Sequence, residues 1–192
     1  QDHTVTDITN ALNRAEVIRT HILRPTWHFV AADDLRWMYA LSYPRLKPVY
    51  RSYAKMLGAD ETVLYRHIPL VEELLSGGRH LSKQEMGEAL TRRGVLLDDN
   101  HLSLLLSFAE LEGVIVNGEL DGSRQTFTLL EEWVPRTTNL SREESLGRLA
   151  HKYFSSHGPA TLQDFAWWSG LSVTECRQAM EMIRPEILQG GR

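Results

Sequence analysis

The sequence predicts a mainly α-helical protein with small β-hairpins, built from tandem winged-helix (helix-turn-helix) units. Helix-start signals recur along the chain. Two stretches, beginning near Gly78 and Gly158, follow the same order of glycine-ended helix, short turn, capped helix and further helix. After the first of them the pattern changes to two short strands around a turn-rich loop, which is the order of a winged helix.

Three units follow from this repeat. Residues 1–58 form an N-terminal winged-helix-like segment, residues 59–138 a central winged helix, and residues 139–192 a third helix-turn-helix unit. We expect both ends to be truncated, because the chain has no initial Met and stops directly after a helical pattern. The groups that carry out the function would then belong in part to a longer protein.

The N-terminal unit mixes helices and strands. The pattern predicts a helix over 6–15, strands over 17–23 and 26–30, a helix from Asp33 or Asp34 to Tyr43, and a further helix over 45–57. Pro44 should interrupt the helical run, with Pro48 in the first turn of the next helix. Alternation in the second strand is expected to send Trp27 and Phe29 to the core, leaving Thr26, His28 and Val30 on the other face.

Capping boxes define the later helices. A Ser or Thr followed three residues later by Glu or Asp satisfies backbone donors at a helix start. It occurs at Ser82/Glu85, Ser141/Glu144, Thr161/Asp164 and Ser172/Glu175. Residues 100–112 then form a helix without Lys or Arg, which predicts packing, and 114–116 and 125–130 form the two strands of the wing.

Composition limits the function. The 192 residues carry a net charge of −4, unlike most non-specific DNA binders, which are basic. Acidic side chains outnumber basic ones only in the middle of the chain, so the first and last segments remain possible DNA faces. No apolar run is long enough for a membrane helix, and the single cysteine fits a cytoplasmic protein. The scattered histidines predict no metal site, and no cofactor motif is present.

Polar groups that could meet DNA gather at three places. Arg24, Thr26 and His28 lie beside the predicted hairpin, where they could contact phosphates or orient a water, or could simply bond to neighbouring backbone. The second group lies around Trp37, which is as well explained as core, and the third is on the polar side of the last helix. The expected DNA contacts of these two groups are Arg36, Arg45, Lys47, Arg177 and Gln178.

Two motifs carry a family resemblance. Residues 19–38, which include Arg-Pro-Thr-Trp-His at 24–28, and residues 157–171, which include Ala-Trp-Trp-Ser-Gly, resemble a bacterial winged-helix family in order and spacing. This family includes the AlkZ-like DNA glycosylases, which remove bulky alkylated bases and unhook interstrand crosslinks. Many other members are labelled only as DNA-binding proteins. The resemblance implies a further β-containing region beyond residue 192.

The resemblance also implies a catalytic motif of Gln, a small or apolar residue, and Gln or Asp upstream of residues 24–28. Gln1 and Asp2 could be its tail, without its first Gln. Catalytic roles then fall to Gln1, Thr26 and His28, and the expected partner is double-stranded DNA that carries damage.

Three functions stay open at this stage. The favoured one is a DNA-repair glycosylase relative that hydrolyses the N-glycosidic bond of alkylated bases, with residues 1–57 lining the lesion. A non-catalytic DNA-binding regulator would read DNA with residues 172–184, which carry Arg177 and Gln178. A structural or protein-binding winged-helix array would suit the acidic middle segment.

Overall fold

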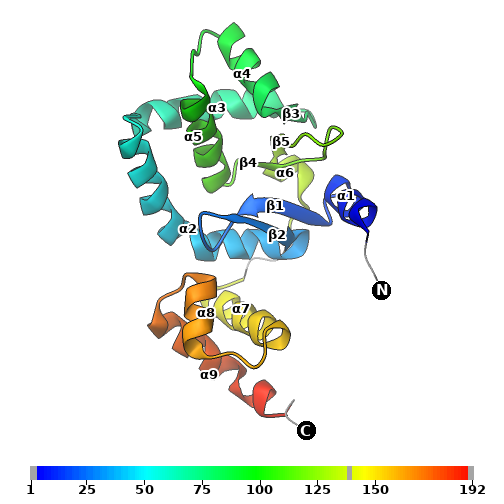
Figure 1. Ribbon diagram of the computed structural model, residues 1–192, viewed down its shortest axis with the longest axis vertical. Helices are drawn as coiled ribbons and strands as arrows, with labels where there is room; N and C mark the ends of the chain where they lie inside the picture. The colour runs from blue at the N-terminus through cyan, green and yellow to red at the C-terminus, as the bar shows by residue number, and fades with distance from the viewer. Residues whose placement is uncertain (1–3, 138–139, 190–192) are drawn as a thin grey trace.

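The computed structural model describes residues 4–137 and 140–189, and confirms a mainly helical protein with small antiparallel hairpins (Figure 1). The elements in chain order are α1 (Val5–Asn13), β1 (Val17–His21), β2 (Trp27–Ala31), α2 (Ala32–Met56), α3 (Glu61–Leu75), β3 (Leu81–Ser82), α4 (Lys83–Arg92), α5 (Asp99–Leu111), β4 (Ile115–Asn117), β5 (Thr126–Leu129), α6 (Leu130–Trp133), α7 (Arg142–Ser156), α8 (Leu162–Ser169) and α9 (Val173–Gln189). No helix among them is both long and apolar enough to cross a membrane.

The middle of the chain has the predicted order of a helix-turn-helix followed by a β-hairpin. Helices α3, α4 and α5 precede β4 and β5, and the short strand β3 joins them in a three-stranded antiparallel sheet of order β3-β5-β4. Helix α5 packs most of its length into the core, as its lack of cations predicted. The division of the chain at residues 58 and 138 stays a prediction.

The predicted capping boxes begin α4, α7 and α8, where each cap side chain accepts from the backbone three residues on and each acid bonds back. Ser172 and Glu175 make the same reciprocal bonds before α9. A cap of this kind stabilises a helix by about 1 kcal/mol. A further box, Thr4 with Asp7, begins α1 and was not predicted.

Helix α2 corrects one expectation. It runs through Pro44 and Pro48 as one 25-residue helix, although the sequence suggested a break at Pro44. The two prolines lie four residues apart on an exposed face of the helix. There the carbonyl oxygens of Ala40 and Pro44, which lose their hydrogen-bond donors, can be hydrated, so the helix bends without ending.

The faces of the first hairpin are also the reverse of the expectation. Val30 is 5% exposed, whereas Trp27 and Phe29 are 43% and 62% exposed. Strand pairing places Ile18 opposite Val30, and these two aliphatic residues bury their face of the hairpin in the same core as the first half of α2. The period of two was right, but the small aliphatic residues occupy the core and the bulky aromatic residues face outward.

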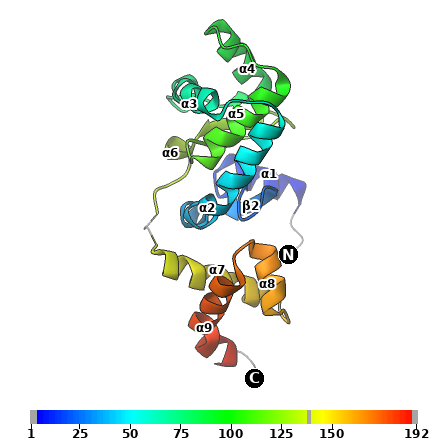
Figure 2. The same cartoon turned by 90° about the vertical axis from the view of Figure 1, so that its left-hand side faces the viewer.

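Two hydrophobic cores result. One joins the β1–β2 hairpin and the first half of α2 to α7, α8 and α9, and the other joins the second half of α2 to α3, α4 and α5. Helix α2 therefore belongs to both cores. Figures 1 and 2 show α7–α9 as a lobe beside α2 and the hairpin, with α3–α5 on the opposite side.

Candidate active site

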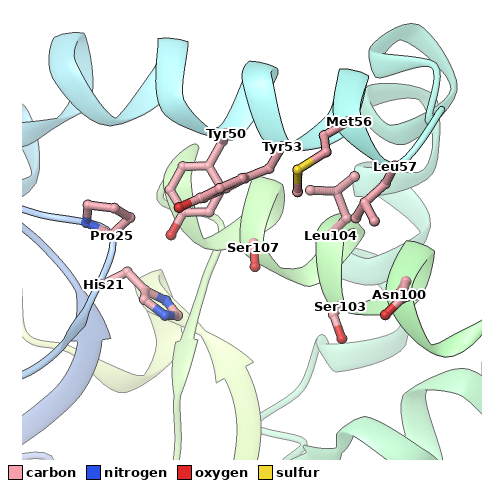
Figure 3. Close-up of a pocket in the computed structure, with 10 residues that line it drawn as sticks. All are labelled: His21, Pro25, Tyr50, Tyr53, Met56, Leu57, Asn100, Ser103, Leu104 and Ser107. Atoms are coloured by element: carbon pink, nitrogen blue, oxygen red, sulfur yellow. The ribbon is translucent and has the colours of Figure 1, made fainter.

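A groove lies between the end of the β1–β2 hairpin, α2 and α5. It consists of two adjoining cavities of about 290 and 250 Å³ that share His21, Ser103 and Ser107. Figure 3 shows the larger cavity, with Tyr50 and Tyr53 extending from α2 and Ser103 and Ser107 from α5. His21 therefore stands where the two cavities meet.

A buried carboxylate supports His21. Glu110, near the end of α5, is 2% exposed and accepts three hydrogen bonds from β1. The His21 backbone N–H donates over 3.1 Å, the Thr20 hydroxyl over 2.6 Å, and His21 Nδ1 lies 2.8 Å from Glu110 Oε2. Thr20 is fully buried and its hydroxyl is also 2.6 Å from that of Tyr39. Four residues, Thr20, His21, Tyr39 and Glu110, thus share one hydrogen-bond network.

This network fixes the imidazole of His21. Because Nδ1 donates to the carboxylate of Glu110, Nε2 is the ring nitrogen that a ligand in the groove can reach. A carboxylate in this position orients a histidine and stabilises its protonated form, as in acid–base dyads. Burial, and secondly the charge of Glu110, raises the pKa of Tyr39, so its hydroxyl keeps its proton at neutral pH. The arrangement can accept or deliver a proton in the groove.

The walls of the two cavities differ in chemistry. The larger cavity is walled by Tyr50, Tyr53, Met56 and Leu57 from α2. Burial first, then the charge of Glu110, raises the pKa of Tyr50, so this side chain is a hydrogen-bond donor at neutral pH. Besides His21, the smaller cavity is lined by residues from β2, the start of α4, α5 and the wing, which are Trp27, Lys83, Ser103, Leu106, Ser107, Glu110, Gln125 and Phe127.

Beside this groove, the tip of the hairpin gathers Arg24, Thr26 and His28. The ring of His28 is half-buried, and its Nδ1 lies 2.8 Å from the Thr26 carbonyl oxygen. Burial is the main cause that lowers the pKa of His28, with further lowering by Arg24 and His21, so the ring is neutral near pH 7. Arg24 turns toward the α7–α9 lobe, with its guanidinium carbon 4.8 Å from the centroid of the Trp167 ring on α8.

Comparison with known proteins identifies the family. The model of the family described as "DNA glycosylase AlkZ-like" matches residues 1–189. The chain belongs to the AlkZ-like DNA glycosylase family. This confirms the resemblance in the sequence. No curated protein matches the chain.

The family fold is also visible in a solved structure, the Streptomyces sahachiroi DNA glycosylase AlkZ. It matches with a TM-score of 0.65 at 18% sequence identity, over 92% of this chain and 50% of that one. The chain therefore spans about half the length of that AlkZ structure. At this identity, the similarity shows a shared fold.

Within this AlkZ-like chain, three cations predicted to contact DNA are bound to carboxylates. Arg36 lies 2.5 Å from Glu131, Arg45 2.9 Å from Glu175, and Lys47 3.2 Å from Glu112. Each pair joins α2 to a distant part of the chain. Their contact with DNA stays a prediction, and it would require these pairs to open.

The remaining predicted residues are dispersed. Arg177 and Gln178 are exposed on α9, away from the groove residues. Gln1 lies outside the described residues. Among the residues that the structure does describe, no group of three His, Cys, Asp or Glu side chains is arranged to hold a metal ion.

Sequence reasoning missed the Thr20, His21 and Glu110 network. Thr20 and His21 lie inside the stretch that carries the family resemblance, but the catalytic residues predicted from that stretch were Thr26 and His28. Glu110 had a signal of its own, because it is a charged residue among the buried Leu106, Ala109 and Leu111 of a helix without cations. A carboxylate in such a place needs donors from elsewhere in the fold.

Proposed function

We propose that this chain is part of a DNA glycosylase that hydrolyses the N-glycosidic bond of alkylated bases in damaged double-stranded DNA. The reacting nucleotide would enter the groove at His21. The protein would act in the cytoplasm. One observation carries the proposal: a histidine at the junction of two open cavities has its Nδ1 bound to the buried Glu110 and its Nε2 left for a ligand. Membership of the AlkZ-like DNA glycosylase family supports assigning this reaction to the groove.

Groups in the groove can account for the proton and the charges of this hydrolysis. Alkylation at a ring nitrogen gives the base a positive charge, so the base leaves with the electron pair of its bond to C1′ and becomes neutral. Water attacks C1′ and passes a proton to His21 Nε2, while Glu110 stabilises the imidazolium that forms. The negative charge of Glu110 also favours the positive charge that develops on the sugar.

The hairpin tip would complete the site. Thr26 directly precedes Trp27, and His28 pairs with Thr20 on the other face of the hairpin from Trp27. Both keep their predicted catalytic role in this proposal, as residues that position water. Gln1 keeps its predicted catalytic role in this proposal. Arg24 would contact the phosphate backbone near the tip.

The test is single-turnover excision of N7-methylguanine from a duplex by the whole protein. His21→Asn keeps a donor for Glu110 but has no second ring nitrogen, so we expect the rate to fall about 100-fold or more. His101→Asn is the matched control, since His101 lies on α5 but bonds to Asp98 outside the groove. No excision by the wild type, or equal rates for His21→Asn and wild type, would contradict the proposal.

A DNA-binding regulator is the second candidate, because Arg177 and Gln178 are exposed on the third helix of the last helix-turn-helix. In that case Arg177→Ala would weaken binding to undamaged duplex and reduce its dependence on salt. His21→Asn would leave that binding unchanged.

A further inference from the structure

Trp27 is an aromatic side chain held in place yet exposed. It belongs to the outward face of the hairpin, where the Arg19 guanidinium carbon lies 3.9 Å from the centroid of a Trp27 ring. The His21 ring centroid lies 3.7 Å from the Trp27 centroid, with 36° between the ring planes. These contacts fix the indole, while 43% of the side chain remains exposed. An ordered indole loses little entropy when a further flat group packs against its exposed part.

The cavity beside Trp27 has the size and lining for one flat ring system. Its volume of about 250 Å³ is below the roughly 300–1,000 Å³ of pockets that hold drug-sized ligands. Trp27, Phe127 and Leu106 give it apolar walls, and Ser103 and Gln125 add hydrogen-bonding groups.

Two charged side chains line this cavity. Glu110, with its side chain 3% exposed, reaches it together with His21. Lys83 also lines it, and among the described residues its ion pair is with Asp99, over 2.6 Å and with Asp99 84% exposed. An exposed pair of this kind contributes little stability, so Lys83 can exchange Asp99 for a phosphate at small cost. The cavity thus combines the His21–Glu110 pair, an aromatic wall and a lysine that can contact a phosphate.

We propose that this Trp27 cavity is a nucleobase subsite, in which a base that has left the stack of the duplex lies against the Trp27 ring. The inference rests on the proposed function and names the side of His21 on which the base is held. Stacking on an aromatic side chain tolerates any base, because each has a π-face. The subsite would therefore accept an unpaired base in general, and the reactivity of the alkylated base would decide which one is excised.

The experiment is photo-crosslinking of the whole protein to a duplex that carries a mispaired 5-iodouracil, with the attached residue mapped by mass spectrometry. We expect the crosslink at Trp27. A crosslink at Tyr50 or Tyr53 would place the base in the larger cavity and overturn the inference. The absence of any crosslink in a bound complex would overturn it as well.

Affinity gives a second readout. Fluorescence anisotropy should show that Trp27→Leu weakens binding to the mispaired duplex about tenfold, while binding to the fully paired duplex is unchanged. Trp27→Phe should recover part of the loss, which separates stacking from folding. Phe29→Leu is the matched control, because Phe29 is exposed on the same strand but lines a different cavity, beside α1. Equal affinities of Trp27→Leu and wild type would overturn the inference.

Failure of the two proposals can be told apart. A crosslink at Trp27 without excision of N7-methylguanine would remove the proposed reaction and leave the base subsite. If Trp27→Leu excised the base at the wild-type rate and the crosslink lay elsewhere, the base subsite would be removed and the proposed reaction would remain.

Discussion

Two buried carboxylates in this molecule have very different partners. Glu110, in the groove, bonds to a backbone N–H, a hydroxyl and an imidazole. Asp34, at the start of α2, lies 2.8 Å from Arg148 and 2.7 Å from Lys152 of α7 and accepts from the Trp37 ring N–H. Both side chains are at most 7% exposed.

The difference separates a chemical site from a structural contact. Asp34 is bound by two cationic side chains of α7 and lines neither cavity of the groove, so it can hold α2 against α7 but does not meet a ligand there. The imidazole of His21 has a second ring nitrogen, Nε2, that can accept a proton, and the side chain faces open space in the groove. The groove should therefore govern the reaction, whereas the α2–α7 contact should govern stability.

The largest effect is expected from Glu110→Gln. The amide keeps the shape of the side chain but cannot stabilise a protonated His21, so the single-turnover rate of excision should fall about 100-fold at pH 7. The measurement is the rate as a function of pH, and circular dichroism checks that the fold is kept. Glu112→Gln is the matched control, since Glu112 bonds to Tyr43, Tyr65 and Lys47 outside the groove. An equal fall in the excision rate of both variants, or no fall in either, would contradict the distinction between the two regions.

Gly170 tests how closely the lobes approach. It has φ of +68°, and a Cβ there would lie 2.9 Å from the Leu23 carbonyl oxygen of the hairpin tip. Gly170→Ala should lower the free energy of unfolding by about 3 kcal/mol, from the left-handed backbone and the clash together.

Gly122 provides the control for that substitution. It has a similar φ of +64° but no atom within 4 Å of the added Cβ, so Gly122→Ala should cost only about 1 kcal/mol. Both values come from urea unfolding. Equal costs would show that the hairpin tip does not contact the last lobe as described.

Asp34→Asn should act on stability alone. Loss of the charge leaves Arg148 and Lys152 without their partner, but these cations are 44% and 47% exposed, so the cost should be about 2 kcal/mol rather than that of a fully buried pair. Excision at a temperature where the variant is folded should match the wild type. A rate as low as that of Glu110→Gln would mean that Asp34 serves the reaction.

The smallest effect concerns the pH dependence contributed by His28. Burial, aided by Arg24 and His21, lowers the pKa of His28 below 6.5, so the unfolded chain binds the proton more readily. The corresponding stability is present above pH 6.5 and is lost as the pH falls below it. Because His80 shares this direction, the readout is the difference between wild type and His28→Gln at pH 7.5 and pH 5.5. A difference that does not change with pH would contradict a neutral, half-buried His28.

Local signals in the sequence predicted the elements well. Capping boxes located the starts of α4, α7, α8 and α9, because a cap depends on residues three positions apart. Alternation also located β2. Neither signal could show which face of the hairpin is buried, since that depends on Ile18 across the hairpin and on α2 behind it.

The candidate site was harder to predict because its contacts are distant in sequence. His21 and Glu110 are 89 residues apart, and no local pattern joins them. The same holds for Arg36, Arg45 and Lys47, whose ion pairs with the distant Glu131, Glu175 and Glu112 no local pattern indicated. A charged residue in a sequence indicates that a hydrogen-bonding or oppositely charged group lies near it, and only the fold shows which group that is.

A structure of the whole protein bound to a duplex with an abasic-site analogue would test the central claim most directly. The account predicts the C1′ position of the analogue in the groove, within hydrogen-bonding distance, directly or through one water, of His21 Nε2. A duplex held on Arg177 and Gln178 of α9, with the analogue remote from His21, would contradict it.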